Sequence, residues 1–129
     1  MKKITILFTL VMLFALTATA QKTAQIKFDK TSHNFGTFST KNPVQKCTFT
    51  FKNVGTAPLV IHQAIASCGC TVPAYTKTPI APGASGKVDV TFNGTGRFDK
   101  HIKKVITVYT NGSPETVRLT IEGDMVEEK

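Results

Sequence analysis

The chain has 129 residues, of which 41% are hydrophobic and 19% are charged, and its 16 basic and 8 acidic side chains give a formal charge of +8. This length suits a single domain that buries a core of its own. The chain has no internal repeat, no low-complexity segment and only one long apolar run, which excludes a repeat array and a multi-span membrane protein.

The first 20 residues have the pattern of a secretory signal peptide. Lys2 and Lys3 precede an apolar run over residues 4–16, and small residues at Ala18 and Ala20 match the pattern before a signal peptidase cut. The run is shorter than the roughly 20 residues that span a bilayer, although an uncleaved anchor is the alternative. We therefore expect a signal peptide over residues 1–20, one domain over residues 21–129, and a periplasmic or secreted protein without an integral membrane span.

The charge of the mature chain indicates which partners to expect. Cleavage removes two lysines, so the formal charge falls from +8 to +6. A basic surface favours anionic partners, and an exported protein does not normally meet nucleic acid. We expect an envelope protein or an anionic glycan as partner and no nucleic acid, although solubility alone also explains a modest positive charge.

The hydrophobic period along the mature chain is two, which is typical of half-buried antiparallel strands. In chain order, strands are predicted at Ile26–Phe28 and Asn34–Phe38, around Cys47, Phe49 and Phe51, around Leu59, Ile61 and Ile65, around Val88, Val90 and Phe92, at Ile102–Thr110, and around Val117, Leu119 and Ile121. Turn residues separate them, and Asn111-Gly112 is the strongest hairpin signal. No segment has the period of an amphipathic helix. The predicted fold class is all-β, a single immunoglobulin-like antiparallel β-sandwich of about seven strands.

Several motifs in this order are similar to a known family. They are the run Phe49–Ile61 with Asn53-Val54-Gly55, the segment Ala66–Pro73 with Cys68-Gly69-Cys70-Thr71, Ile80–Gly83, Lys87–Phe92, Gly96–Lys100 and Ile121–Asp124. Together they resemble the bacterial domain of unknown function family 1573 over most of Phe28 to Val126. The family resembles immunoglobulin-like modules of the major sperm protein and cilium-associated type. The resemblance implies a binding scaffold and no defined biochemical activity, and Cys47 lies outside its motif.

The three thiols leave several interpretations open. Cys47 alternates in phase with two phenylalanines, so it is predicted to face the core as an inert buried thiol. As the candidate disulfide partner, Cys47 alternatively bridges to Cys68 or Cys70. Gly69 is expected to allow a close backbone approach or a positive φ between the last two thiols.

Cys68 and Cys70 are also the candidate thiol or metal site. Alternate residues of an extended chain lie about 6.6 Å apart, near the upper limit for a disulfide, and such a short bridge exchanges easily. Two thiolates on one face equally suit a soft metal, either copper(I) or zinc, with His62, His101 or Met125 as weak candidates to complete the site. No histidine has a recognised ligand spacing, so no metal or other cofactor is expected.

Two functions therefore follow from the sequence. The first is an exported, non-catalytic immunoglobulin-like module that binds or supports another envelope component, and it is not an enzyme. The alternative is a thiol-redox or soft-metal binding protein that uses Cys68 and Cys70. A structural turn is the simplest role for the Cys-Gly-Cys motif. The basic cluster from Arg97 to Lys104 is expected to be a solvated strand surface.

Overall fold

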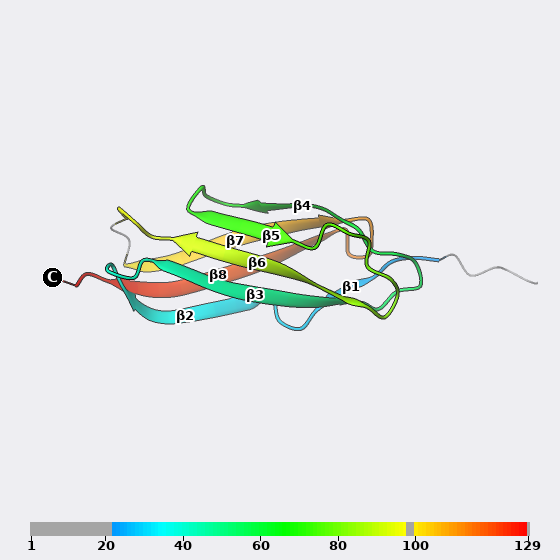
Figure 1. The fold of residues 1–129 in the computed structure, drawn as a ribbon, viewed down its shortest axis with the longest axis horizontal. Helices are drawn as coiled ribbons and strands as arrows, with labels where there is room; N and C mark the ends of the chain where they lie inside the picture. The colour runs from blue at the N-terminus through cyan, green and yellow to red at the C-terminus, as the bar shows by residue number, and fades with distance from the viewer. Residues whose placement is uncertain (1–21, 98–99, 129) are drawn as a thin grey trace, which may run out of the picture.

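The protein is a sandwich of two four-stranded β-sheets (Figure 1). The computed structural model describes residues 22–97 and 100–128, so the expected signal peptide lies outside the described residues. No helix in the described ranges is long and apolar enough to cross a membrane. The strands are β1 Ile26–Phe28, β2 Ser32–Ser39, β3 Val44–Asn53, β4 Ile61–Ala66, β5 Thr71–Tyr75, β6 Ser85–Asn93, β7 His101–Thr110 and β8 Thr116–Val126.

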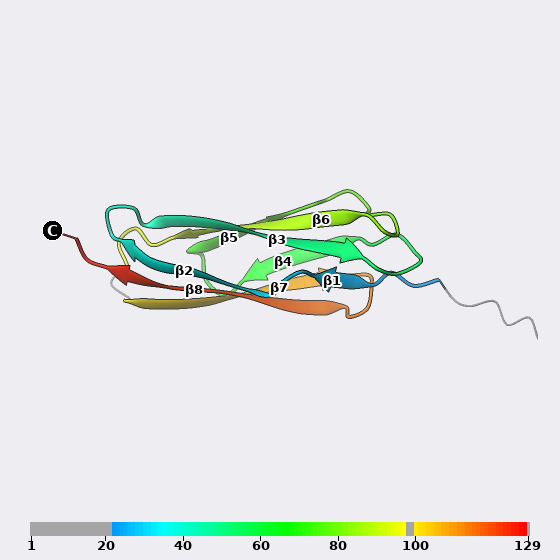
Figure 2. The same ribbon diagram turned by 90° about the horizontal axis from the view of Figure 1, so that it is seen from below.

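The first two strands behave as one strand that changes sheets. The strand orders are β1-β3-β6-β5 and β2-β8-β7-β4, and every pair is antiparallel except β2 with β8. At the crossing, Asp29 N–H donates to the Thr50 carbonyl at 3.0 Å, and Thr120 N–H donates to the Thr31 carbonyl at 2.8 Å. Residues 29–31 therefore join the two layers on one lateral side, as Figure 2 shows from below.

The predicted alternation produces the core. The inward residues of β3, β6 and β8 pack together between the sheets with the β7 residues Ile106 and Val108. The fully buried members include Phe49, Phe51, Val88, Val90, Phe92, Leu119 and Ile121. Each such side chain contributes about 1.5–3 kcal/mol relative to exposure, so this layer supplies most of the favourable free energy of folding. The all-β, immunoglobulin-like prediction is confirmed.

The structure departs from the predicted strands at two places. A register shift between Ile61 and Gln63 reverses the phase of β4, so Ile65 is 45% exposed while Ala64 and Ala66 pack against the core. The prediction that Ile65 faces inward is wrong, because a β-bulge inserts an extra residue into the period of two. The strand β5 was not predicted, and it brings the described total to eight.

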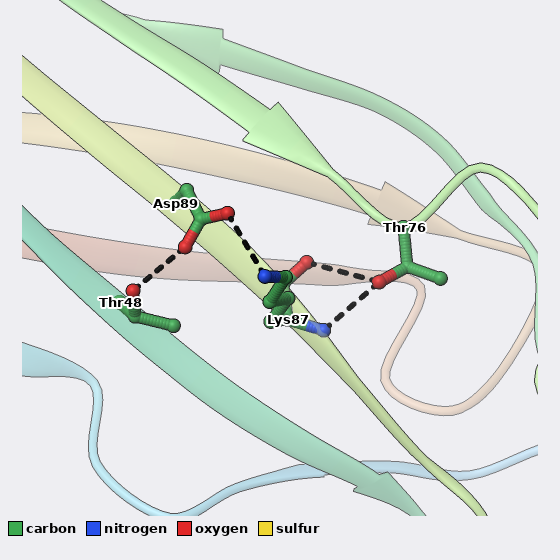
Figure 3. A network of polar contacts seen from close by, with 4 residues as sticks. All are labelled: Thr48, Thr76, Lys87 and Asp89. Carbon is green, nitrogen blue, oxygen red and sulfur yellow. Dashed lines mark hydrogen bonds and ion pairs between the residues drawn. The ribbon is translucent and has the colours of Figure 1, made fainter.

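Polar side chains connect three segments on the outer face of the first sheet (Figure 3). The Thr48 hydroxyl donates to Asp89 Oδ1 at 2.6 Å, and Lys87 Nζ lies 3.6 Å from Asp89 Oδ2. Lys87 N–H donates to the Thr76 hydroxyl at 3.1 Å. These groups are largely exposed, so each contact adds little to stability, and the face is polar and solvated.

One end of the sandwich is organised by a buried amide. The side chain of Asn53 is fully buried and donates to the carbonyls of Ala57 and Ile80 at 2.8 and 2.9 Å. Its Oδ1 accepts from the N–H groups of Gln25 and Gly55 at 3.3 and 3.0 Å. Asn53 thus joins residue 25 to the β3–β4 and β5–β6 connections, and we call this pole the Asn53 end. The opposite pole, with the β4–β5 turn and the C-terminus (Figure 1), is the cysteine end.

Candidate functional site

The Cys-Gly-Cys motif forms the turn that carries the chain from β4 to β5 and so from one sheet to the other. Ser67 is the last residue before the turn that is hydrogen-bonded to β7, since its N–H donates to the Val105 carbonyl at 2.9 Å. The Cys70 carbonyl accepts from Asn93 N–H at 2.8 Å, which starts the pairing with β6. Only Cys68 and Gly69 lie between these two anchors. The motif is therefore placed by hydrogen bonds to both sheets.

Cys68 and Cys70 are joined by a disulfide across this turn. Their Cα atoms are 5.3 Å apart, inside the range that a disulfide spans, and Cys47 is the free cysteine of the chain. The bridge from Cys47 that the sequence left open is not formed. Val90 lies opposite both Cys47 and Pro73, so β3 and β5 are separated by two inter-strand spacings, about 10 Å.

The two sulfurs have unequal surroundings. Cys68 Sγ accepts from Cys70 N–H at 3.3 Å, and it lies 3.9 Å from both the Thr71 hydroxyl and Arg97 Nη2. Cys70 Sγ lies 3.6 Å from the same hydroxyl. The sequence placed Arg97 only in a general basic cluster, because no local spacing connects residues 29 positions apart. Three donor groups therefore surround the first sulfur.

Access to the two sulfurs also differs. Cys70 is only 8% exposed, whereas Cys68 is partly buried and Gly69 is exposed. A Cβ built on Gly69 would meet no atom within 4 Å, and the backbone φ is positive only at other glycines such as Gly83 and Gly96. The expectation of a close approach or a positive φ at Gly69 is wrong. Glycine here leaves the outer side of the turn open.

A cleft of about 620 Å³ lies beside Arg97 at the cysteine end. Its walls come from the β6–β7 connection, the start of β7 and the end of β8, and they include Arg97, Lys100, His101 and Asp124. His101 Nδ1 is 2.9 Å from Asp124 Oδ1. The cleft thus carries two cations, Arg97 and Lys100, and two carboxylates, Asp124 and Glu127, and the cation Arg97 lies next to the Cys68 sulfur.

The structure does not gather the proposed metal ligands. His62 is exposed on β4, His101 pairs with Asp124, and Met125 is buried in the core. Within residues 22–97 and 100–128, no group of three or more His, Cys, Asp or Glu side chains could hold a metal ion. Neither histidine therefore completes a site with Cys68 and Cys70.

Cys47 is a partly buried thiol on β3. It lies in phase with the buried residues of β3 and packs against the core. Burial raises its pKa from 9.0 to about 11; nearby Lys30 opposes this shift and Asp89 adds to it. The predicted inward orientation is confirmed, and the thiol is protonated at neutral pH.

Comparison with known proteins places the chain in a family. Residues 26–125 match the model of the family described as "Protein of unknown function (DUF1573)", and the chain belongs to this family. No curated protein matches the chain significantly. The resemblance drawn from the sequence is confirmed.

Solved structures share the fold. A protein of unknown function from Porphyromonas gingivalis W83 has a TM-score of 0.64 at 19% identity, over 85% of this chain and 50% of that chain. The ASH/PapD-like domain 7 of human CEP192 also has a TM-score of 0.64, at 15% identity, over 88% of this chain and 95% of that chain. The VesB protease of Vibrio cholerae has a TM-score of 0.60 at 18% identity, over 78% of this chain and 32% of that chain. The chain therefore spans half of the P. gingivalis protein and a third of the protease, and these identities establish the fold alone.

Proposed function

We propose that this member of the DUF1573 family is an exported, non-catalytic binding module of the bacterial cell envelope, and that it binds an extended segment of another envelope protein along the free edge of β3. The observation that carries the proposal is a half-strand of unpaired backbone at this edge. The expected signal peptide and the immunoglobulin-like, PapD-like fold support it. Such folds present strand edges to which a peptide adds as a further strand.

The free edge arises because β1 is short. β1 pairs with Phe51–Asn53 only, after which the chain crosses to the other sheet. On its other side β3 pairs with β6, and Gly94 N–H donates to the Pro43 carbonyl at 2.9 Å. In an antiparallel ladder the bonding direction alternates, so the N–H and C=O groups of Val44, Lys46 and Thr48 point away from β6. No strand among the described residues pairs with them.

The other edges of the sandwich are less suited to accept a strand. Thr76 N–H donates to the Lys87 carbonyl of β6. Because the bonding direction alternates along β5, the backbone of Pro73 points to the free side of this strand, where proline offers no N–H donor. Register shifts interrupt β4 between Ile61 and Gln63 and β2 between Asn34 and Thr37, and β1 has only three residues. Proline and bulges are devices that prevent edge pairing, and the open half of β3 has neither.

The side chains along the β3 edge indicate the chemistry of the partner. Val44 is 45% exposed and Lys46 is exposed on the outer face, and the mature chain carries a formal charge of +6. An extended peptide with an apolar residue and acidic neighbours complements this edge. An anionic glycan would contact the lysine but would not need the backbone N–H groups.

Site-specific photo-crosslinking tests the proposal in the bacterium that makes the protein. A photo-reactive amino acid at Val44 is expected to crosslink to an envelope protein, and Lys46→Pro is expected to abolish the crosslink because it removes the outward N–H. Lys46→Ala, which keeps that N–H, is the matched control and should retain at least half of the yield. A crosslink that survives Lys46→Pro, or one lost equally in Lys46→Ala, contradicts strand addition. Circular dichroism verifies that both variants fold.

The disulfide favours a second candidate function, thiol–disulfide exchange, over soft-metal binding. Copper(I) and zinc bind cysteine as the thiolate, and the sulfurs of Cys68 and Cys70 are bonded to each other. Titration of the reduced protein with copper(I) and zinc, compared with a Cys68→Ser/Cys70→Ser double variant, tests the metal alternative. A 1:1 complex lost in the double variant would restore it.

A further inference from the structure

We infer that Cys68 is the sulfur through which this disulfide exchanges with an external thiol, and that Arg97 stabilises the negative charge on this sulfur. The inference rests on the thiol-exchange candidate function and not on strand addition at β3. It assigns different roles to the two cysteines, since Cys68 is attacked from outside and Cys70 closes or opens the internal bond. The exchange partner is a small thiol that carries carboxylates, for which glutathione is the probe.

Access selects Cys68 as the sulfur that an external thiol reaches. Exchange requires a thiolate to approach one sulfur of the disulfide directly. Cys70 is 8% exposed and packs in the core cluster, whereas Cys68 is partly buried at the surface. Apart from Cys68 and Cys70 themselves, no atom lies within 4 Å of a Cβ built on the exposed Gly69, so no other segment covers this side of the turn. An incoming thiolate therefore reaches Cys68 Sγ without displacing the core.

Charge selects the same sulfur when the pair is reduced. A thiolate is stabilised by N–H donors and by a neighbouring guanidinium, and only the thiolate is nucleophilic. Cys68 Sγ has the Cys70 N–H at 3.3 Å and Arg97 Nη2 at 3.9 Å. Among the described residues, Cys70 Sγ has one such donor, the Thr71 hydroxyl at 3.6 Å. The negative charge of the reduced pair therefore resides on Cys68.

The exchange balances in two steps. In the first step a thiolate RS⁻ attacks Cys68 Sγ and the Cys68–Cys70 bond breaks. Cys70 leaves as a thiolate next to the Thr71 hydroxyl and takes a proton from solvent. A second thiolate then attacks the RS sulfur, forms RS–SR and releases the Cys68 thiolate. The protein disulfide gains two electrons, and the two external thiols lose two. The reverse sequence reoxidises the protein.

The cleft next to Arg97 indicates that the external thiol carries carboxylates. Arg97, Lys100 and His101 line this cavity of about 620 Å³ together with the carboxylates of Asp124 and Glu127, and Arg97 Nη2 lies 3.9 Å from Cys68 Sγ. Glutathione carries carboxylates that the guanidinium of Arg97 beside Cys68 attracts, and it is small enough for a cavity of this volume. Cysteamine, a thiol without a carboxylate, is the matched probe for this contribution.

Trapping of the mixed disulfide tests the assignment of Cys68. Purified mature protein carrying Cys70→Ser is incubated with oxidised glutathione at pH 7 and analysed by mass spectrometry. We expect one glutathione on Cys68, formed at least tenfold faster than on Cys70 in the reciprocal Cys68→Ser variant. Cys47 is present in both variants as an internal control and is expected to stay unmodified, because its thiol is protonated. Faster trapping on Cys70 overturns the assignment.

The rate of exchange tests the role of Arg97. We expect Arg97→Gln to slow trapping on Cys68 about fivefold at pH 7, which is the effect of losing one charged contact. The loss should become smaller as the pH rises, because the Cys68 thiol then ionises without the guanidinium. Lys27→Gln removes one charge from β1, which pairs with β3 at the opposite end of the sandwich, and it should change the rate less than twofold. Equal effects of the two variants, or a pH-independent loss, overturn the role of Arg97.

Redox titration of the unmodified protein separates failure of this inference from failure of the candidate function. A disulfide that glutathione buffers reduce and reform reversibly, with circular dichroism unchanged, supports thiol exchange. A disulfide that dithiothreitol cannot reduce in the folded protein eliminates both the candidate function and the inference. Reversible exchange combined with attack at Cys70 keeps the candidate function and eliminates the inference. Glutathione is expected to react faster than cysteamine, and the reverse order would contradict an anionic partner.

Discussion

The two ends of the sandwich are stabilised in different ways. At the Asn53 end, one buried amide makes four hydrogen bonds to backbone groups, and residues 23–25 close directly over Gly55. At the cysteine end, a turn without such an amide carries a disulfide, and open space surrounds Gly69. The same fold thus has one end closed by a buried amide and one end closed by a disulfide, in which Cys70 is buried and Cys68 is partly buried.

This difference indicates where function can reside. A fully satisfied buried network makes one conformation much more stable than its alternatives, and it offers no group to a partner. The cysteine end and the adjoining open half of β3 retain a disulfide and unpaired, exposed backbone groups that a partner can contact. The groups that a partner can use therefore lie at the end opposite Asn53.

The largest expected difference between the ends comes from their asparagines. Asn53→Ala leaves four backbone groups without their partner, so we expect the free energy of unfolding to fall by about 3 kcal/mol. Asn93→Ala at the cysteine end removes one exposed hydrogen bond to Thr95 N–H and should cost less than about 1 kcal/mol. Urea unfolding of both variants measures the difference, and similar losses would remove the proposed asymmetry.

Glycine substitutions provide a smaller and sharper comparison. In Gly55→Ala the new Cβ would lie 2.5 Å from Gln25 N. Because this neighbour is a backbone atom that cannot move freely, we expect the free energy of unfolding to fall by about 2 kcal/mol. In Gly69→Ala the Cβ meets nothing within 4 Å, so the unfolding free energy should stay within about 0.5 kcal/mol of the parent. Thermal and urea unfolding of the pair measure both values. A loss at Gly69 as large as that at Gly55 would show that the cysteine turn is also closely packed.

The smallest expected effect concerns Cys47, the thiol without the donors that surround Cys68. Its pKa in the folded protein is about 11 against a reference value of 9.0, so the folded state holds the proton more tightly than the unfolded state. The resulting stabilisation is complete below pH 9 and is lost as the pH rises from 9 to 11. Urea midpoints between pH 8 and pH 10.5 should therefore fall more for the parent than for Cys47→Ala. Parallel declines would show that burial does not affect this thiol.

The sequence was sufficient for most of the sandwich because its strands keep a strict period of two. Phe49, Val90 and Leu119 lie in the core as the alternation predicts. The phase failed at Ile65, because a bulge is set by the pairing of β4 with β7 and has no local signal. β5 was missed because Pro73 is unfavourable inside a strand, and only the sheet order shows that it occupies an edge.

The candidate site was predictable only in part. The Cys-Gly-Cys motif identified the turn and the family, but the pairing of its sulfurs depends on whether Cys47 is within reach, which is a property of strand order. The contact of Arg97 with Cys68 joins residues 29 positions apart through the β6–β7 connection. No periodicity or spacing encodes that proximity, so the feature that distinguishes the two sulfurs emerged from the fold.

The parallel pairing of β2 with β8 has a mechanical consequence. The described chain enters the sandwich at the Asn53 end and leaves it at the cysteine end (Figure 1), and these two strands run in the same direction. Tension applied between the two ends therefore pulls β2 and β8 in opposite senses along their own axes. Their hydrogen bonds carry this load in shear and together, instead of opening one after another. Such a load reaches the β2–β8 pair after the three residue pairs that join β1 to β3.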